Sequence, residues 1–128
     1  MGRYLYSLLL LLCAPLLITH VVCKYRRENQ DPMVAKRLGF YIPQSMSGCI
    51  WIHACSLGES KVGVELARAL IKKTPSLRIL MTATTPAGLN FLAQSEFTSH
   101  VFPWDFRWVW SRWLSKLSPK ALVIVETE

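Results

Sequence analysis

The sequence predicts an α/β fold in which the strands of a parallel sheet alternate with helices. Short apolar runs of strand length recur along residues 50–125. Segments with the apolar spacing of a helix lie between these runs. Turn-forming stretches, such as Ser-x-Gly-Glu and Thr-Thr-Pro, separate each strand from its helix. Strands and helices that alternate at this spacing form a parallel sheet with right-handed crossovers.

The chain is organised around its first strand and the helix that follows. Residues 50–54 are apolar and partly β-branched, which favours a buried strand. A Ser-x-Gly-Glu break then opens a helix. The predicted apolar face of that helix consists of Val62, Leu66, Ala67, Leu70 and Ile71.

Three more strands complete the predicted sheet. Residues 78–83 form the second strand, and Pro86 begins the helix that follows it. A short third strand is expected at residues 101–103, near a sheet edge, because its proline cannot donate a ladder hydrogen bond. Asp105 is the expected cap of the next helix. Residues 121–125 then form a fourth strand, which we expect to be buried.

Residues 1–23 are predicted to be a transmembrane anchor. The stretch from Tyr4 to Cys23 is nearly uncharged and rich in Leu, and about twenty apolar residues span a hydrocarbon core of about 30 Å. A cleaved signal peptide is the alternative, but it would need a shorter apolar region and small residues at a cleavage site. Basic residues crowd the far side of the stretch, so the positive-inside bias places the rest of the chain in the cytoplasm.

Residues 24–48 are predicted to be a basic juxtamembrane linker, with a short helix near residues 33–38 and then a loop. Its basic residues either are solvated or hold an anionic leaflet, and the sequence leaves both open. They are Lys24, Arg26, Arg27, Lys36 and Arg37. Residues 49–128 then form a single, partial α/β domain.

Charge and cysteine usage narrow the possible partners. Fifteen Lys and Arg against eight Asp and Glu give a net charge of +7, which suits nucleic acid, an anionic membrane or a phosphorylated substrate. The chain lacks a basic helix with interleaved base-reading residues, so no nucleic-acid partner is expected. The four cysteines show no CxxC pair and no His at metal spacing. We therefore expect free thiols, buried or in the membrane, and no metal site.

Polar residues and glycines follow three of the predicted strands. Because the carboxyl ends of parallel strands meet at one edge and carry the chemistry of open α/β sheets, we expect these residues to lie together. They are Ser56, Gly58 and Glu59 after the first strand, Thr84, Thr85 and Gly88 after the second, and Glu126 after the fourth. The alternative for Glu59 is that it complements the dipole of its own helix. The alternative for the serine and threonines is helix capping, and His53 is expected to be a hydrogen-bonded core residue.

Residues 51–59 read WIHACSLGE. This stretch resembles the W-[IV]-H-A-x-S-x-G-E signature of the bacterial Kdo transferases, which add 3-deoxy-D-manno-octulosonic acid (Kdo) to a lipid A precursor. Residues 37–41, 82–88 and 119–128 agree with that family in order and spacing. The resemblance implies the Rossmann-like amino-terminal domain of a GT-B type glycosyltransferase, preceded by a transmembrane helix. It also implies a single-pass protein of the cell inner membrane, with its catalytic domain on the cytoplasmic face.

The resemblance also implies a reaction and roles for the edge residues. The amino-terminal domain would hold the lipid A precursor, and a carboxyl-terminal domain would hold the donor, CMP-Kdo. A carboxylate would take the proton from the acceptor hydroxyl as its oxygen attacks the anomeric carbon, which inverts that centre. Glu59 is the expected base and Glu126 a second carboxylate, and neither a metal nor a cofactor is expected. The implied acceptor-binding residues are Ser56, Gly58, Thr84, Thr85 and Gly88.

The chain departs from the family pattern in two positions and in length. Cys55 stands where small residues are usual, and Ala87 stands where many members have a hydroxyl or basic residue. The sequence stops at residues 126–128, at the carboxyl end of a strand. We therefore expect a truncated chain, about one third of the enzyme, that is inactive alone. The alternative function is a membrane-tethered basic α/β module that binds phospholipid or nucleic acid without catalysis.

Overall fold

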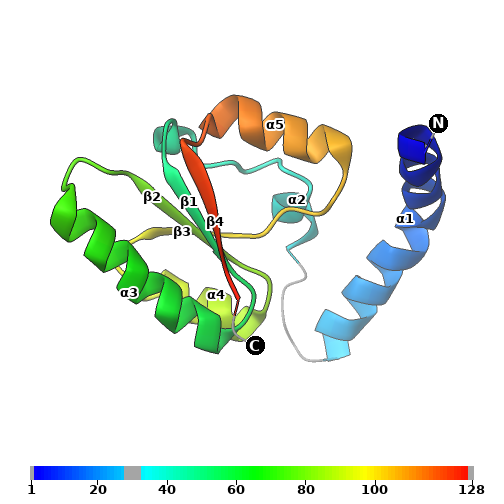
Figure 1. The fold of residues 1–128 in the computed structure, drawn as a ribbon. Coiled ribbons are helices and arrows are strands. Elements are labelled where there is room, and N and C mark those ends of the chain that lie inside the picture. The colour runs from blue at the N-terminus through cyan, green and yellow to red at the C-terminus, as the bar shows by residue number, and fades with distance from the viewer. Residues whose placement is uncertain (1, 28–32, 127–128) are drawn as a thin grey trace.

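The structure, a computed structural model, describes residues 2–27 and 33–126. The long helix α1 (Gly2–Arg27) lies beside an α/β body made by the other elements (Figure 1). Residues 28–32 of the predicted linker and the predicted end of the chain at 127–128 lie outside the described residues.

Four parallel strands form the sheet, in the order β3-β2-β1-β4. They are β1 (Ile50–Ala54), β2 (Ile79–Ala83), β3 (Thr98–Val101) and β4 (Ala121–Val125). In register, Ala54 at the carboxyl end of β1 pairs with Ala83 of β2 on one side and with Val125 of β4 on the other. The predicted parallel α/β sheet is confirmed, and β1 occupies a central position in it.

Helices cover both faces of the sheet (Figure 1). α3 (Leu57–Lys73) and α4 (Pro86–Ala93) pack on one face, and α5 (Arg107–Leu117) packs on the other. Side chains alternate along β1, so Trp51 faces α5 while Ile52 faces α3. The result is one apolar core on each side of the sheet.

The segment between α1 and β1 is part of the body. It contains α2 (Val34–Arg37) and the 3-10 helix η1 (Gln44–Met46). Ile42 and Met46 are buried in the core beside α5. Gly39 has a φ of +77°, and a Cβ at this position would lie 3.4 Å from the Trp113 ring, so a side chain here would be strained. This part of residues 24–48 therefore packs on the α/β body.

Two strand predictions need correction. β3 begins at Thr98, three residues before the predicted start at 101, because pairing with β2 overrides the polar character of Thr98 and Ser99. Its predicted edge position is confirmed. β4 is also an edge strand, and it is not buried: Leu122 is 40% exposed and Ile124 is 63% exposed.

Two helix predictions also need correction. Phe106, without a side-chain hydrogen bond, is the residue that caps α5. Asp105 lies one residue too early to cap the helix, and it instead accepts a hydrogen bond from the Tyr6 hydroxyl of α1 at 2.8 Å. On α3, Val62 is 51% exposed and does not belong to the buried face. The rest of the predicted face is confirmed, since Ala67 is buried and Leu66, Leu70 and Ile71 pack against the core. Ser60, Gly63 and Val64 are also buried on this face.

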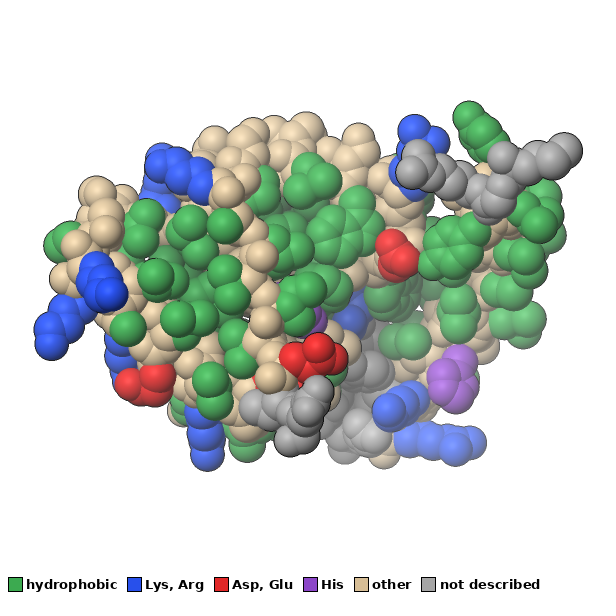
Figure 2. Space-filling model, viewed as in Figure 1, with side chains coloured by type: hydrophobic (Ala, Val, Ile, Leu, Met, Phe, Trp, Pro, Cys, Tyr) green, Lys and Arg blue, Asp and Glu red, His purple; other side chains and the backbone are tan. Residues whose placement is uncertain are grey.

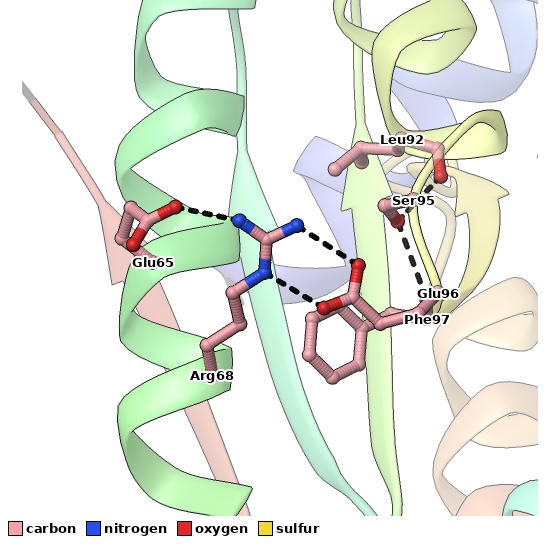
Figure 3. Close-up of polar contacts among 6 residues, drawn as sticks. All are labelled: Glu65, Arg68, Leu92, Ser95, Glu96 and Phe97. Atoms are coloured by element: carbon pink, nitrogen blue, oxygen red, sulfur yellow. Dashed lines mark hydrogen bonds and ion pairs between the residues drawn. The ribbon is translucent and has the colours of Figure 1, made fainter.

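Arg68 fastens α3 to the connection between α4 and β3 (Figure 3). Its Nε and Nη2 donate to the two carboxylate oxygens of Glu96 at 2.7 and 3.1 Å, and its Nη1 donates to Glu65 at 2.8 Å. All three side chains are about half exposed or more, so water screens the attraction and the network contributes little to stability. The network links the exposed surface of α3 to Glu96.

Candidate functional site

The strand order places a topological switch point between β1 and β4. The chain goes from β1 through α3 on one face and enters β4 from α5 on the other face. The order therefore reverses between β1 and β4. In open α/β sheets, ligands bind outside the carboxyl ends of the strands at this switch point. The turns after β1 and β4 lie at this switch point.

Glu59 lies in the first turn of α3, with its carboxylate directed back to the end of β1. Its Oε2 accepts hydrogen bonds from the N–H groups of Cys55 at 2.7 Å and Ser56 at 2.9 Å. The Ser56 hydroxyl in turn accepts from the Glu59 N–H at 3.4 Å, which completes a capping box. The carboxylate thus lies at the predicted edge. The capping alternative for Ser56 is present in the structure, and Glu59 lies in the first turn of α3, where the dipole alternative places it.

The turn after β2 is joined to the turn after β1. The carbonyl oxygen of Cys55 accepts hydrogen bonds from the N–H groups of Thr84 at 3.3 Å and Thr85 at 3.1 Å. The Thr85 hydroxyl caps α4 by accepting from the Gly88 N–H at 3.2 Å. The Thr84 hydroxyl makes no hydrogen bond with any residue that the structure describes, and Thr84 is half-buried. Of the two threonines, Thr84 is the better placed to bind a ligand.

The two predicted glycines have different surroundings. A Cβ at Gly88 would lie 2.9 Å from the Ser60 hydroxyl and 3.2 Å from the Ser56 carbonyl oxygen, so this glycine allows α4 to approach the turn after β1. A Cβ at Gly58 would meet nothing within 4 Å among the described residues. Gly58 lies in the first turn of α3 and not among the positive-φ residues. Gly58 therefore leaves open space beside the turn after β1.

Glu126 directly follows Val125, which pairs with Ala54 at the end of β1. It is exposed at the carboxyl end of β4. The sheet therefore brings Glu126 to the same edge as the β1 turn. Cys55, predicted to be buried or in the membrane, is also exposed here, because the chain turns outward as soon as β1 ends.

His53 is a buried, hydrogen-bonded residue of β1, as the sequence predicts. Its Nδ1 lies 3.2 Å from the carbonyl oxygen and 3.1 Å from the hydroxyl of Thr82. Its ring stacks on Phe102 with 3.7 Å between centroids. Burial lowers the pKa of His53 below the ordinary value, which favours the neutral ring. His53 thus helps to fix the sheet beneath the site.

The protein is expected to lose stability as the pH falls below about 6.5. Burial lowers the pKa of both His53 and His100 in the folded state, so the unfolded chain binds more protons in this range and unfolding becomes easier. Arg68 lowers the pKa of Glu96 to about 2, so that carboxylate stays ionised here. Urea midpoints at pH 7.5 and 5.5 measure the effect, and His53→Gln should reduce the difference. Equal midpoints would contradict the prediction.

Arg37 also lies at this edge, which was not predicted. In the sequence it is one of several juxtamembrane charges, but in the structure it is only 5% exposed. Its Nη2 donates to the carbonyl oxygen of Thr84 at 2.8 Å. The signal that distinguishes Arg37 from its basic neighbours is its place at the start of residues 37–41, one of the stretches that resemble the Kdo transferases.

The described residues contain no group of three or more His, Cys, Asp or Glu side chains that could hold a metal ion. The groups that this edge presents are the carboxylates, hydroxyls and backbone N–H groups described above. A carboxylate held by two N–H groups beside a turn of hydroxyls can accept a proton from a bound alcohol.

Comparison with known proteins agrees with the resemblance seen in the sequence. The family model described as 3-deoxy-D-manno-octulosonic-acid transferase (kdotransferase) matches residues 33–128. The 3-deoxy-D-manno-octulosonic acid transferase of Haemophilus influenzae is 31% identical over the whole chain, which covers 31% of that protein. The Bordetella pertussis transferase of the same name is 28% identical over the whole chain, which covers 32% of it.

A third relative, the 3-deoxy-D-manno-octulosonic acid transferase of Aquifex aeolicus, is 30% identical over 70% of this chain and 26% of its own length. The chain thus spans about one third of the length of the first two relatives, 31% and 32%. The family match includes β1 and every predicted site residue from Ser56 to Glu126. With a family model that extends from residue 33 to residue 128, the chain belongs to the 3-deoxy-D-manno-octulosonic-acid transferase (Kdo transferase) family and carries its amino-terminal α/β domain.

Proposed function

We propose that this chain is the acceptor half of a glycosyltransferase that moves Kdo from CMP-Kdo to a lipid A precursor in lipopolysaccharide core biosynthesis. One observation supports this most directly: the Glu59 carboxylate is held at the end of β1 by the N–H groups of Cys55 and Ser56, within a chain of the Kdo transferase family. CMP-Kdo would bind through a carboxyl-terminal domain of the full-length protein, and the acceptor half alone would be inactive.

In the proposed step, the acceptor hydroxyl oxygen forms a bond to the anomeric carbon of Kdo. The bond between that carbon and the phosphate oxygen breaks, and CMP leaves with the electron pair. Glu59 takes the proton of the hydroxyl as general base. Because the two bonds lie on opposite sides of the anomeric carbon, the reaction inverts its configuration. Glu126 would be a second carboxylate that raises the proton affinity of Glu59 or orients the acceptor.

The remaining edge residues would bind the acceptor. The Thr84 hydroxyl makes no hydrogen bond with a described residue. Ser56 and Thr85 lie at the amino ends of α3 and α4. Helix amino ends carry partial positive charge and orphan N–H groups, which favour phosphate. Gly58 leaves open space beside the turn, and Gly88 keeps α4 close to it.

A direct transfer assay tests the proposal. Full-length protein in vesicles is given CMP-Kdo and a lipid A precursor, and mass spectrometry follows the acceptor. The expected result is an acceptor heavier by Kdo, with an anomeric configuration opposite to that of the donor in the NMR spectrum. Retained configuration would contradict the inverting step. Vesicle binding without any transfer would instead favour a membrane-tethered module that lacks catalytic activity.

We further propose that α1 anchors the protein in the inner membrane, with the α/β domain on the cytoplasmic face. Residues Tyr4–Lys24 are long and apolar enough to cross a bilayer, and the body buries none of this stretch. Hydrophobic side chains accordingly gather along α1 in Figure 2. Its exposed leucines need an apolar solvent. They are Leu5, Leu8, Leu9, Leu11, Leu12, Leu16 and Leu17.

A second surface suits the membrane interface. We call it the α5 surface, and it consists of the exposed Phe40, Tyr41, Trp108 and Arg112. The Arg112 guanidinium lies over the Phe40 ring, 5.7 Å from its centroid, and the Phe40 and Trp108 centroids are 6.4 Å apart. Aromatic rings at the headgroup level and a cation beside anionic lipid are typical of interfacial surfaces.

Arg112→Gln is expected to weaken binding to anionic vesicles in a protein that lacks residues 1–24. One basic residue near such a surface is worth about 1 kcal/mol, so the partition coefficient should fall about fivefold. Cosedimentation with vesicles measures it. Lys72→Gln is the matched control, because α3 lies on the opposite face of the sheet from α5. Equal losses in both variants would mean that net charge, and not the α5 surface, governs binding.

A further inference from the structure

Arg37 is a buried cation at the edge of the sheet that carries the candidate site. It is the last residue of α2, and only 5% of it is exposed. Its Nη2 donates to the main-chain carbonyl oxygen of Thr84 at 2.8 Å. Moving a guanidinium out of water costs several kcal/mol unless hydrogen bonds compensate. The position of Arg37 is therefore set by specific contacts and not by solvent.

Both main-chain polar groups of Thr84, its N–H and its carbonyl oxygen, make hydrogen bonds. Its N–H donates to the carbonyl oxygen of Cys55 at 3.3 Å, and its carbonyl oxygen accepts from Arg37. The first bond joins Thr84 to the turn that contains Glu59, and the second joins it to α2. With both peptide groups held, the direction of the Thr84 Cα–Cβ bond is fixed as well. Neither bond uses the Thr84 hydroxyl.

The main chain of Arg37 makes a further connection. Its carbonyl oxygen accepts from the Trp104 N–H at 3.0 Å, so Arg37 links α2 to the segment that leads from β3 into α5. Gly39, two residues later, packs against Trp113 of α5. The Arg37 backbone is thereby anchored in the α5 core while its side chain reaches the turn after β2.

We propose that Arg37 is a positioning residue for the acceptor site, which it serves by fixing the turn that presents Thr84. This proposal deepens the acceptor role proposed above for Thr84 and rests on it. Arg37 connects that turn to the segment that follows the membrane anchor, so the acceptor site has a fixed place relative to that segment. A planar guanidinium suits this role because its donors have fixed directions, whereas a lysine ammonium is a flexible point charge.

The experiment compares Arg37→Met, Arg37→Lys and the matched control Lys36→Met in the full-length protein. Lys36 is the exposed cation next to Arg37 on the same short helix. Hydrogen–deuterium exchange is measured first, without substrates. Arg37→Met should speed exchange of the hydrogen-bonded N–H groups of Thr84, Thr85 and Gly88 about tenfold, which corresponds to the loss of one charged hydrogen bond. Residues 50–54 in the centre of the sheet should exchange as in the wild type, and Lys36→Met should change neither segment.

Steady-state kinetics gives the second readout. In Arg37→Met the KM for the lipid A precursor should rise about tenfold, with the KM for CMP-Kdo unchanged, and Arg37→Lys should recover part of the loss. A fall in melting temperature with unchanged exchange at Thr84, Thr85 and Gly88 and an unchanged acceptor KM would overturn the proposal. If Arg37→Met does not fold, the same two measurements on Arg37→Lys decide it. If the wild type transfers no Kdo, the proposed function fails. The exchange data still test whether Arg37 holds the turn that contains Thr84, so the two failures can be told apart.

Discussion

In the full-length protein, Glu59→Gln is expected to lower kcat for Kdo transfer about 10²- to 10⁴-fold, the range that a general base contributes. An amide cannot take the proton from the acceptor hydroxyl. It can still accept hydrogen bonds from the N–H groups that hold Oε2 of Glu59, since glutamine also serves in capping boxes. The melting temperature should therefore stay close to that of the wild type. Transfer assays and thermal unfolding measure the two effects.

Glu65→Gln is the matched control for this variant. Glu65 lies on the same helix, exposed on its surface and bonded to Arg68, so its loss should leave both transfer and folding nearly unchanged. Unimpaired transfer by Glu59→Gln would leave Glu59 as a helix cap only. In that case Glu126→Gln, at the end of β4, becomes the test of whether a carboxylate at this edge acts as the base.

Trp113→Ala is expected to destabilise the domain by about 3–5 kcal/mol, the usual cost of removing a large buried aromatic residue. Trp113 is fully buried and stacks on Trp51 with 5.0 Å between ring centroids. This loss is a large part of the stability of an ordinary domain, about 5–15 kcal/mol. Trp108→Ala on the same helix removes a ring that is 46% exposed and should cost less than about 1 kcal/mol. Urea unfolding measures both variants.

A pair of phenylalanine substitutions sharpens this test. The Trp51 Nε1 donates to the Thr82 hydroxyl at 2.8 Å, whereas no described residue accepts a hydrogen bond from the Trp113 Nε1. Trp51→Phe therefore loses a buried hydrogen bond as well as volume, and it should cost about 1 kcal/mol more than Trp113→Phe. Equal costs would mean that the bond to Thr82 adds nothing to stability.

Much of the fold follows from local pattern. β1 is a short apolar run of strand length, and α3 has helical spacing together with a cap and an acid in its first turn. Pro86 stands at the first turn of α4, as the sequence predicts. These features act over a few residues, so periodicity and capping chemistry are enough to find them.

Features set by distant parts of the chain were not predictable in the same way. β4 lies at an edge of the four-stranded sheet that the described residues form, and Ile124 is exposed there. β3 contains Thr98 and Ser99 and becomes a strand because β2 offers it a partner. Strand order and pairing depend on tertiary contacts, which a single sequence does not display.

The same division holds for the candidate site. The alternation of strands and helices predicts that Ser56, Glu59, Thr84 and Glu126 leave the sheet at one edge. Sequence alone did not reveal that this edge is the switch point between β1 and β4, which depends on strand order. It also did not reveal Arg37, because a basic residue in a charge-rich segment looks solvated until the fold buries it.

The hydrogen bond between Tyr6 and Asp105 ties the amino-terminal part of α1 to the α/β body. Tyr6 lies roughly 27 Å along the helix axis from Lys24 at about 1.5 Å per residue, so a helix that crosses a bilayer places these two residues at opposite interfaces. Asp105 cannot follow Tyr6 through the lipid while the α/β body stays in water. The hydrogen-bonded arrangement and the membrane-spanning arrangement proposed above therefore exclude each other. In the spanning arrangement, the aromatic side chains that line the gap with α1, Trp104 and Phe106 among them, would lose this neighbour.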